Sequence, residues 1–187
     1  MGFVDRILEE IGSAPGAGGG LSLYALLDAA REPRVVSFLE GVPETSDSLY
    51  EGEKGRELAP YAPYLVEIPG DSPLAGDLAA QAFGKSYCVF VTAEAKFTDL
   101  RRHFRRYLMA ETEDGKKVYF RFYDPRVLRV FLPTCTPEEL RQFFGPIRSF
   151  WAEAREPETL SRFWVGEDGL LREDKRSISH WEQARSA

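Results

Sequence analysis

The chain has 187 residues, 43% of them hydrophobic, which is enough to bury a core without disulfides or metals. Its formal net charge is −6, so the average surface would repel the phosphate backbone of a nucleic acid, and no nucleic-acid partner is expected. The two cysteines, Cys88 and Cys135, lie far apart in the sequence and provide neither a disulfide framework nor a CxxC metal-binding pair.

The first twenty residues, 1–20, form a segment of their own. Apolar residues at helical spacing predict a short amphipathic helix over residues 3–11, and the glycine-rich stretch 13–20 predicts a flexible linker. Acidic residues interrupt the apolar ones, unlike in a signal peptide, and no run of the chain is long and apolar enough for membrane insertion. We therefore expect a cytoplasmic protein whose main domain starts near Leu21.

The first half of the main domain alternates strands and helices. Apolar and β-branched runs predict the strands, and proline in the first turn with glycine at the end predicts the helices. The predicted strands cover residues 21–30, 64–68 and 86–93, the predicted helices cover 31–41 and 72–84, and a loop covers 43–63. Alternation of this kind indicates an α/β layer architecture.

The second half begins with a strongly amphipathic helix over residues 95–108. A β-hairpin follows, with Asp114-Gly115 as its two-residue turn. Asp124 before Pro125 predicts the start of one helix, and Thr136 with Glu139 predicts a capping box at the start of the next. The last predicted strands cover residues 149–155 and 161–166.

Together these elements predict one α/β domain over residues 21–166, built on a mixed β-sheet of five or six strands flanked by helices. The polar tail, residues 167–187, is expected to fray.

A basic cluster lies on the 95–108 helix, opposite its apolar face. Its members are Arg101, Arg102, Arg105 and Arg106. They could form a docking surface for an acidic partner or a phosphate, or simply the solvated back of an amphipathic helix, which is the more common case. A nucleic-acid-binding module is the weakest of these alternatives. His103, in the same stretch, is expected to be exposed.

Two carboxylates are the candidate catalytic residues. Asp28 lies at the end of the first strand and Asp124 at a strand-to-helix junction, so together they could serve a small-molecule hydrolase. Helix capping explains Asp124 without catalysis, and a cap or an ion pair with Arg121 or Arg126 would explain Asp28. The chain has no HExxH, CxxC, GxSxG or P-loop motif, so no metal or cofactor is expected.

Aromatic residues near the C-terminus are the candidates for a partner surface. They include Phe143, Phe144, Trp151 and Trp164. Aromatic side chains are enriched at interfaces but also dominate cores, and most of these are expected to be core residues.

Four segments in a fixed order carry a resemblance: YALLDAA (24–30), PYLVEI (63–68), RFYDPRVL (121–128) and FFGPI (143–147). Over roughly residues 21–152 the chain resembles a bacterial family first catalogued as a domain of unknown function and linked to type VI secretion, in which its members are effector chaperones or adaptors. The resemblance implies a protein that is not an enzyme. It would bind a secreted effector in the producing cell and help load it onto the spike tip protein.

The resemblance also identifies residues. Arg121, Asp124, Pro125 and Arg126 match the core motif of that family, and Asp28 matches the acid at the end of its first strand. The resemblance implies that they maintain the fold or line a pocket. Many relatives continue into a larger helical lobe, whereas this chain ends soon after its second tryptophan strand.

Overall fold

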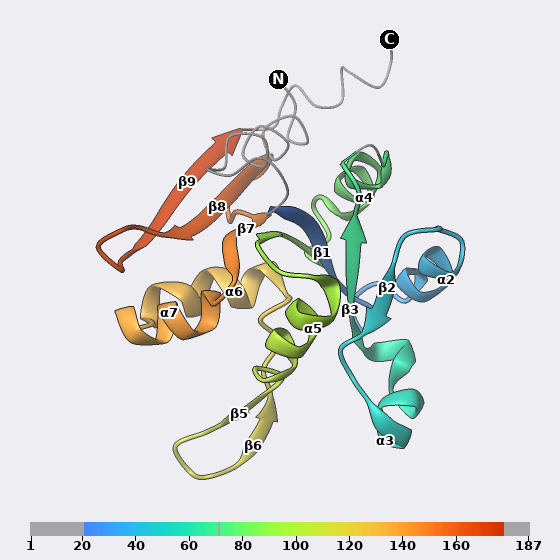
Figure 1. The fold of residues 1–187 in the computed structure, drawn as a ribbon, viewed down its shortest axis with the longest axis horizontal. Helices are drawn as coiled ribbons and strands as arrows, with labels where there is room; N and C mark the ends of the chain where they lie inside the picture. Colours follow the sequence, from blue (N-terminus) through green and yellow to red (C-terminus); the bar gives the residue numbers. More distant parts are fainter. Residues whose placement is uncertain (1–20, 71, 178–187) are drawn as a thin grey trace.

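The computed structural model describes residues 21–70 and 72–177. Seven strands form one sheet in the order β2-β3-β1-β4-β7-β8-β9, and every neighbouring pair is antiparallel (Figure 1). The strands are β1 (Ser22–Asp28), β2 (Ser46–Ser48), β3 (Pro63–Ile68), β4 (Cys88–Ala93), β7 (Ile147–Glu153), β8 (Thr159–Val165) and β9 (Leu171–Ser177). A separate two-stranded hairpin consists of β5 (Met109–Glu111) and β6 (Lys117–Tyr119).

Helices cover both faces of the sheet. They are α2 (Arg34–Glu40), α3 (Gly52–Glu57), α4 (Leu74–Ala82), α5 (Phe97–Arg105), α6 (Pro125–Phe131) and α7 (Pro137–Phe144), with 3₁₀ turns at Ala59–Tyr61 and Leu132–Thr134. Buried side chains of α5, α6 and α7 join one core cluster, and those of α2 and α4 join a second. The sheet therefore separates two cores.

The position of β1 in the interior of the sheet explains why its sequence is an almost continuous apolar run. Tyr24 and Leu26 belong to the first core cluster, whereas Leu23, Ala25 and Leu27 belong to the second. Alternate residues of a strand point to opposite faces, so a strand that is buried on both faces needs apolar residues at every position.

The α/β, single-domain prediction is confirmed, but the sheet differs from the expected one. It has seven strands instead of five or six, and it is antiparallel throughout instead of mixed. The helices between strands suggested parallel crossovers, yet β1 returns as β3 in the opposite direction at its side. The predicted helix at residues 3–11 lies outside the described residues.

Elements were missed in two regions where the sequence has no apolar pattern. The predicted loop 43–63 contains the polar strand β2, the helix α3 and a 3₁₀ turn. The expectation that the chain frays from Glu167 is wrong for Leu171–Ser177, which forms the edge strand β9. Charged residues protect a sheet edge from other chains, and for that reason an edge strand can look like a solvated tail.

Candidate functional site

The family-motif residues meet where β1 ends and α6 begins. Asp28 is the last residue of β1, and Asp124 immediately precedes α6. Asp28 is fully buried, and Asp124 has a relative exposure of 1%. Buried carboxylates need charged or hydrogen-bonding partners, because their desolvation is otherwise too costly.

Asp28 has two such partners. Its Oδ1 accepts a hydrogen bond from the backbone N–H of Ala30 at 3.1 Å, and its Oδ2 accepts one from Nη2 of Arg121 at 2.5 Å. The ion pair with Arg121 is one of the two pairings that the sequence left open for Asp28. It joins β1 to the segment just before α6, although the two residues are far apart in the sequence.

Asp124 caps α6, as predicted. Its Oδ1 accepts from the backbone N–H of Arg126 at 2.9 Å, and its two oxygens accept from the guanidinium of Arg126 at 3.0 and 2.6 Å. Burial alone would raise the pKa of Asp124, but the hydrogen bonds and charge of Arg126 outweigh burial and lower the pKa. Pro125 is the first residue of α6 and is buried, so it begins the helix and also packs in the interior of the domain.

A single guanidinium nitrogen links the two carboxylates. Nη2 of Arg121 lies 2.5 Å from Asp28 and 3.8 Å from Asp124. The two acids that the hydrolase hypothesis requires are therefore brought together, but with an arginine between them. A general acid or base needs a carboxyl group that faces the substrate, and both of these face guanidinium groups instead.

Two tyrosines, the buried Tyr123 and the partly buried Tyr50, lie beside this cluster, and no sequence pattern indicated their part in it. Tyr50 and Tyr123 lie close enough to influence each other's pKa, and Asp28 is close enough to raise the pKa of both. Burial is the largest cause of the raised pKa in each case. Tyr50 follows the missed strand β2, so no sequence pattern connected it to the motif.

The arginines of α5 are largely used within the domain. Arg101 donates to the carbonyl oxygen of Ser48 and pairs with Glu51, and Arg105 donates to the carbonyl oxygen of Leu49 and also pairs with Glu51. They hold the segment after β2 against α5. This contact is an internal one, different from both the docking surface and the solvated face that were considered.

The other two arginines differ from each other. The Arg102 side chain is 75% exposed and pairs with Asp99 on the same helix. Arg106 points back to His103, and its Nη2 lies 2.6 Å from the ring Nδ1. Of the four arginines, Arg102 and Arg106 are therefore the two exposed residues that an external partner could reach.

His103 is buried, with 4% exposure, so the expectation that it is exposed is wrong. Its Nε2 lies 2.7 Å from the carbonyl oxygen of Phe143. A neutral ring that donates from Nε2 and accepts from Arg106 at Nδ1 satisfies both contacts. Burial is the main cause of the lowered pKa of His103, which favours this neutral form.

Three of the four candidate interface aromatics are core residues. Phe143, Phe144 and Trp151 have exposures of 2%, 4% and 5%. Trp164 is partly exposed, and the guanidinium carbon of Arg162 lies 4.7 Å from the centre of its ring. Trp164 is thus the member of this set that a partner could reach without unfolding.

Within residues 21–70 and 72–177, no group of three or more His, Cys, Asp or Glu side chains is arranged to hold a metal ion. In the same ranges, the helices are all too short or too polar to cross a membrane.

Fold and motif together define the class of this protein: a single α/β domain in which two buried aspartates, paired with arginines, join the first strand to a capped helix. The chain belongs to the family described as a domain of unknown function (DUF4123), whose model matches residues 23–142. Neither the curated proteins nor the solved structures gave a match to this chain.

Proposed function

We propose that this protein is an adaptor or chaperone that binds a type VI secretion effector in the cytoplasm and helps load it onto the spike tip protein. The observation that carries the proposal is that the charged groups of the RFYDPR motif bind each other and the buried Asp28, although Arg121 and Arg126 are themselves partly exposed. A motif whose charged groups bind one another stabilises the fold and leaves no group free for catalysis. We therefore favour a protein that acts by binding its partner stoichiometrically. The specific link to secretion rests on the sequence resemblance.

The geometry gives less support to the hydrolase alternative. Asp28 and Asp124 are both buried and both bound by arginine, so neither is free to take a proton from water or substrate. We therefore favour a protein that binds without catalysis.

Exposed apolar side chains support a protein partner. Of the six large apolar side chains exposed in the described ranges, three lie in the β5–β6 hairpin: Met109, Val118 and Tyr119. Met109 and Tyr119 are directly opposite each other in the hairpin. Figure 1 shows the hairpin extending away from the seven-stranded sheet. Exposed apolar side chains on a projecting hairpin are more typical of a surface that contacts a partner than of residues that only stabilise the domain.

The test is co-purification of the tagged chain from its native host, in cells shown to express the secretion system. Mass spectrometry should recover a toxin-like protein or a spike tip protein at near-equal stoichiometry. A Met109→Ser, Tyr119→Ser variant should recover less of it, whereas Leu170→Ser, at an exposed apolar residue outside the hairpin, should not. Recovery of the chain alone would count against the proposal.

A further inference from the structure

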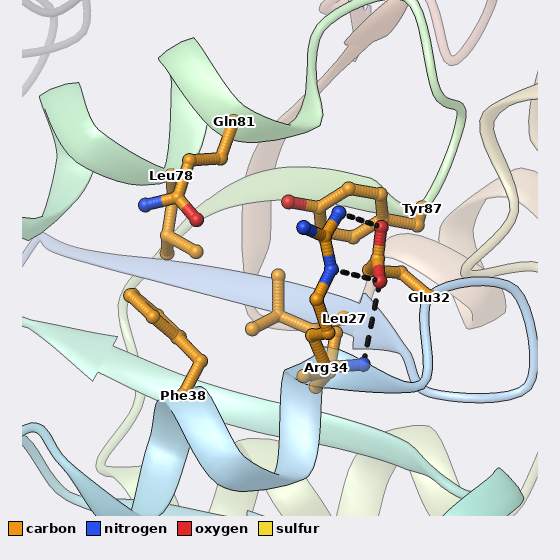
Figure 2. Close-up of a pocket in the computed structure, with 8 residues that line it drawn as sticks. Leu27, Glu32, Arg34, Phe38, Leu78, Gln81 and Tyr87 are labelled. Atoms are coloured by element: carbon orange, nitrogen blue, oxygen red, sulfur yellow. Dashed lines mark hydrogen bonds and ion pairs between the residues drawn. The ribbon is translucent and has the colours of Figure 1, made fainter.

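A pocket lies on the second face of the sheet, between α2 and α4 (Figure 2). Its walls are apolar and come from three elements: Leu27 of β1, Val35 and Phe38 of α2, and Leu78 of α4. It measures about 360 Å³, including the space at its open mouth. Because part of this volume is open solvent, the enclosed space is small, and it suits one side chain better than a nucleotide-sized cofactor.

The polar group inside the pocket is the hydroxyl of Tyr87. The residue has only 4% exposure, and Figure 2 shows its hydroxyl directed into the space between the two helices. Across residues 21–70 and 72–177, this hydroxyl makes no hydrogen bond. The hydroxyl is not among the buried polar atoms that lack a partner, so it is open to the pocket and can donate to an occupant that supplies an acceptor.

At ordinary pH the phenol of Tyr87 is protonated, so it can act as a hydrogen-bond donor. Burial is the largest cause that raises the pKa of Tyr87, to about 12. The hydroxyl therefore keeps its proton and can donate it to an oxygen of the occupant.

An ion pair between Arg34 and Glu32 lies at the mouth of the pocket. Nε and Nη2 of Arg34 donate to the two carboxylate oxygens of Glu32 at 2.8 and 2.9 Å. The pair is neutral as a whole and its guanidinium is already engaged, so the mouth is not built for an anion. Gln81, which also lines the pocket, adds an exposed amide that can both donate and accept.

We propose that this pocket binds one apolar side chain of a partner polypeptide, with Tyr87 donating to the adjoining backbone carbonyl oxygen and Gln81 facing the next peptide group. Apolar walls, one buried donor, one amide and a neutral mouth match a hydrophobic residue between two peptide groups. The inference rests on the proposed function only in taking the ligand to be a polypeptide. Anchor residues of this kind supply much of the affinity of protein interfaces.

The test uses small peptide mimics and follows the backbone amide signals of the full chain by NMR. N-acetyl-leucinamide should cause saturable shifts at Leu27, Val35 and Leu78, and N-acetyl-glycinamide, which lacks the side chain, should not. Tyr87→Phe should weaken leucinamide binding about three- to tenfold, as loss of one hydrogen bond does. Tyr61→Phe, at an exposed tyrosine, should leave binding unchanged.

Two outcomes would overturn the inference. The first is no saturable shift with leucinamide although the protein is folded. The second is binding of toluene as strong as that of leucinamide, with no effect of Tyr87→Phe, which would show a plain apolar cavity. Co-purification tests the proposed function separately, so an effector that still co-purifies with a chain that binds no mimic would refute the pocket alone.

Discussion

At the scale of single residues, the motif cluster shows which interactions short-range patterns can predict. The cap at Asp124 is a local device, and Asp-Pro before an apolar run predicted it correctly. The partner of Asp28 is distant in the sequence, so the sequence allowed an ion pair with either Arg121 or Arg126. The structure assigns Arg121 to Asp28 and Arg126 to Asp124.

Asp124→Ala should lower the free energy of unfolding by about 1–2 kcal/mol, because it removes the cap of α6 and a partner of Arg126. Chemical denaturation measures the change. Asp99→Ala, which removes an exposed ion pair with Arg102, is the matched control and should have little effect. If Asp124→Ala kept its stability but lost partner binding, the scaffold role of the motif would be wrong.

His103 should make the stability of the domain depend on pH. Its pKa in the folded state is lowered, mainly by burial, below the ordinary value of about 6.5. The unfolded chain therefore binds the proton first. The contribution of His103 to stability is complete above about pH 6.5 and is lost as the pH falls through its lowered folded-state pKa.

Denaturation midpoints measured from pH 7.5 to pH 5 should therefore fall for the native chain. His103→Gln keeps an N–H donor toward Phe143 but cannot titrate, so its midpoints should fall less. His180→Gln, at the other histidine of the chain, serves as the control. Equal slopes for the native chain and His103→Gln would contradict this assignment.

Gly145→Ala should destabilise the domain by more than about 1 kcal/mol, because alanine disfavours the positive φ of 49° at this position. A Cβ atom there would also lie 2.6 Å from Cε1 of His103. Part of the cost should therefore disappear when alanine replaces His103, as a double-mutant cycle would show. The same cost in both backgrounds would mean that the contact with His103 does not matter.

At the scale of elements, prediction succeeded where the apolar pattern was strong and failed where it was weak. The capping box at Thr136 and the helix α7 after it were found because Thr and Glu three residues apart form a known local signal. β2 and β9 were missed because they are polar edge strands, whose burial is small on both faces. The tyrosine in the pocket was missed because nothing local distinguishes Tyr87 from other strand aromatics.

The strand β9 gives a prediction at this scale. It pairs with β8 from Thr159↔Ser177 to Val165↔Leu171, and Glu173 accepts a hydrogen bond from Ser161. A chain that ends at Glu167 should therefore melt at a lower temperature and aggregate more than a chain that ends at Ser177, because β8 becomes an open edge. Thermal melts and light scattering compare the two. Equal behaviour would show that β9 adds no stability.

At the scale of the whole molecule, the family match and the folding unit have different ends. The match stops at residue 142, within α7. The first core cluster continues beyond it with Phe143, Phe150 and Phe163, and β7 forms one neighbour of β4. The region that matches the family model is therefore shorter than the structure that buries its apolar residues.

A fragment of residues 21–142 should accordingly lack a cooperative melt and bind a dye for exposed apolar surface, whereas residues 21–177 should melt cooperatively. Circular dichroism and dye fluorescence distinguish the two. A cooperative melt of the shorter fragment would mean that β7, β8 and β9 are an addition to a complete domain.

The central place of β1 has a consequence for the protein during synthesis. Both of its hydrogen-bonding neighbours, β3 and β4, come later in the chain. At typical rates of translation, the stretch from Asp28 to Ala93 takes roughly 3–13 s to emerge from the ribosome. Until β3 emerges this largely apolar strand has both edges open, and until β4 emerges it still has one, so a neighbouring nascent copy could pair with it before its own partners arrive.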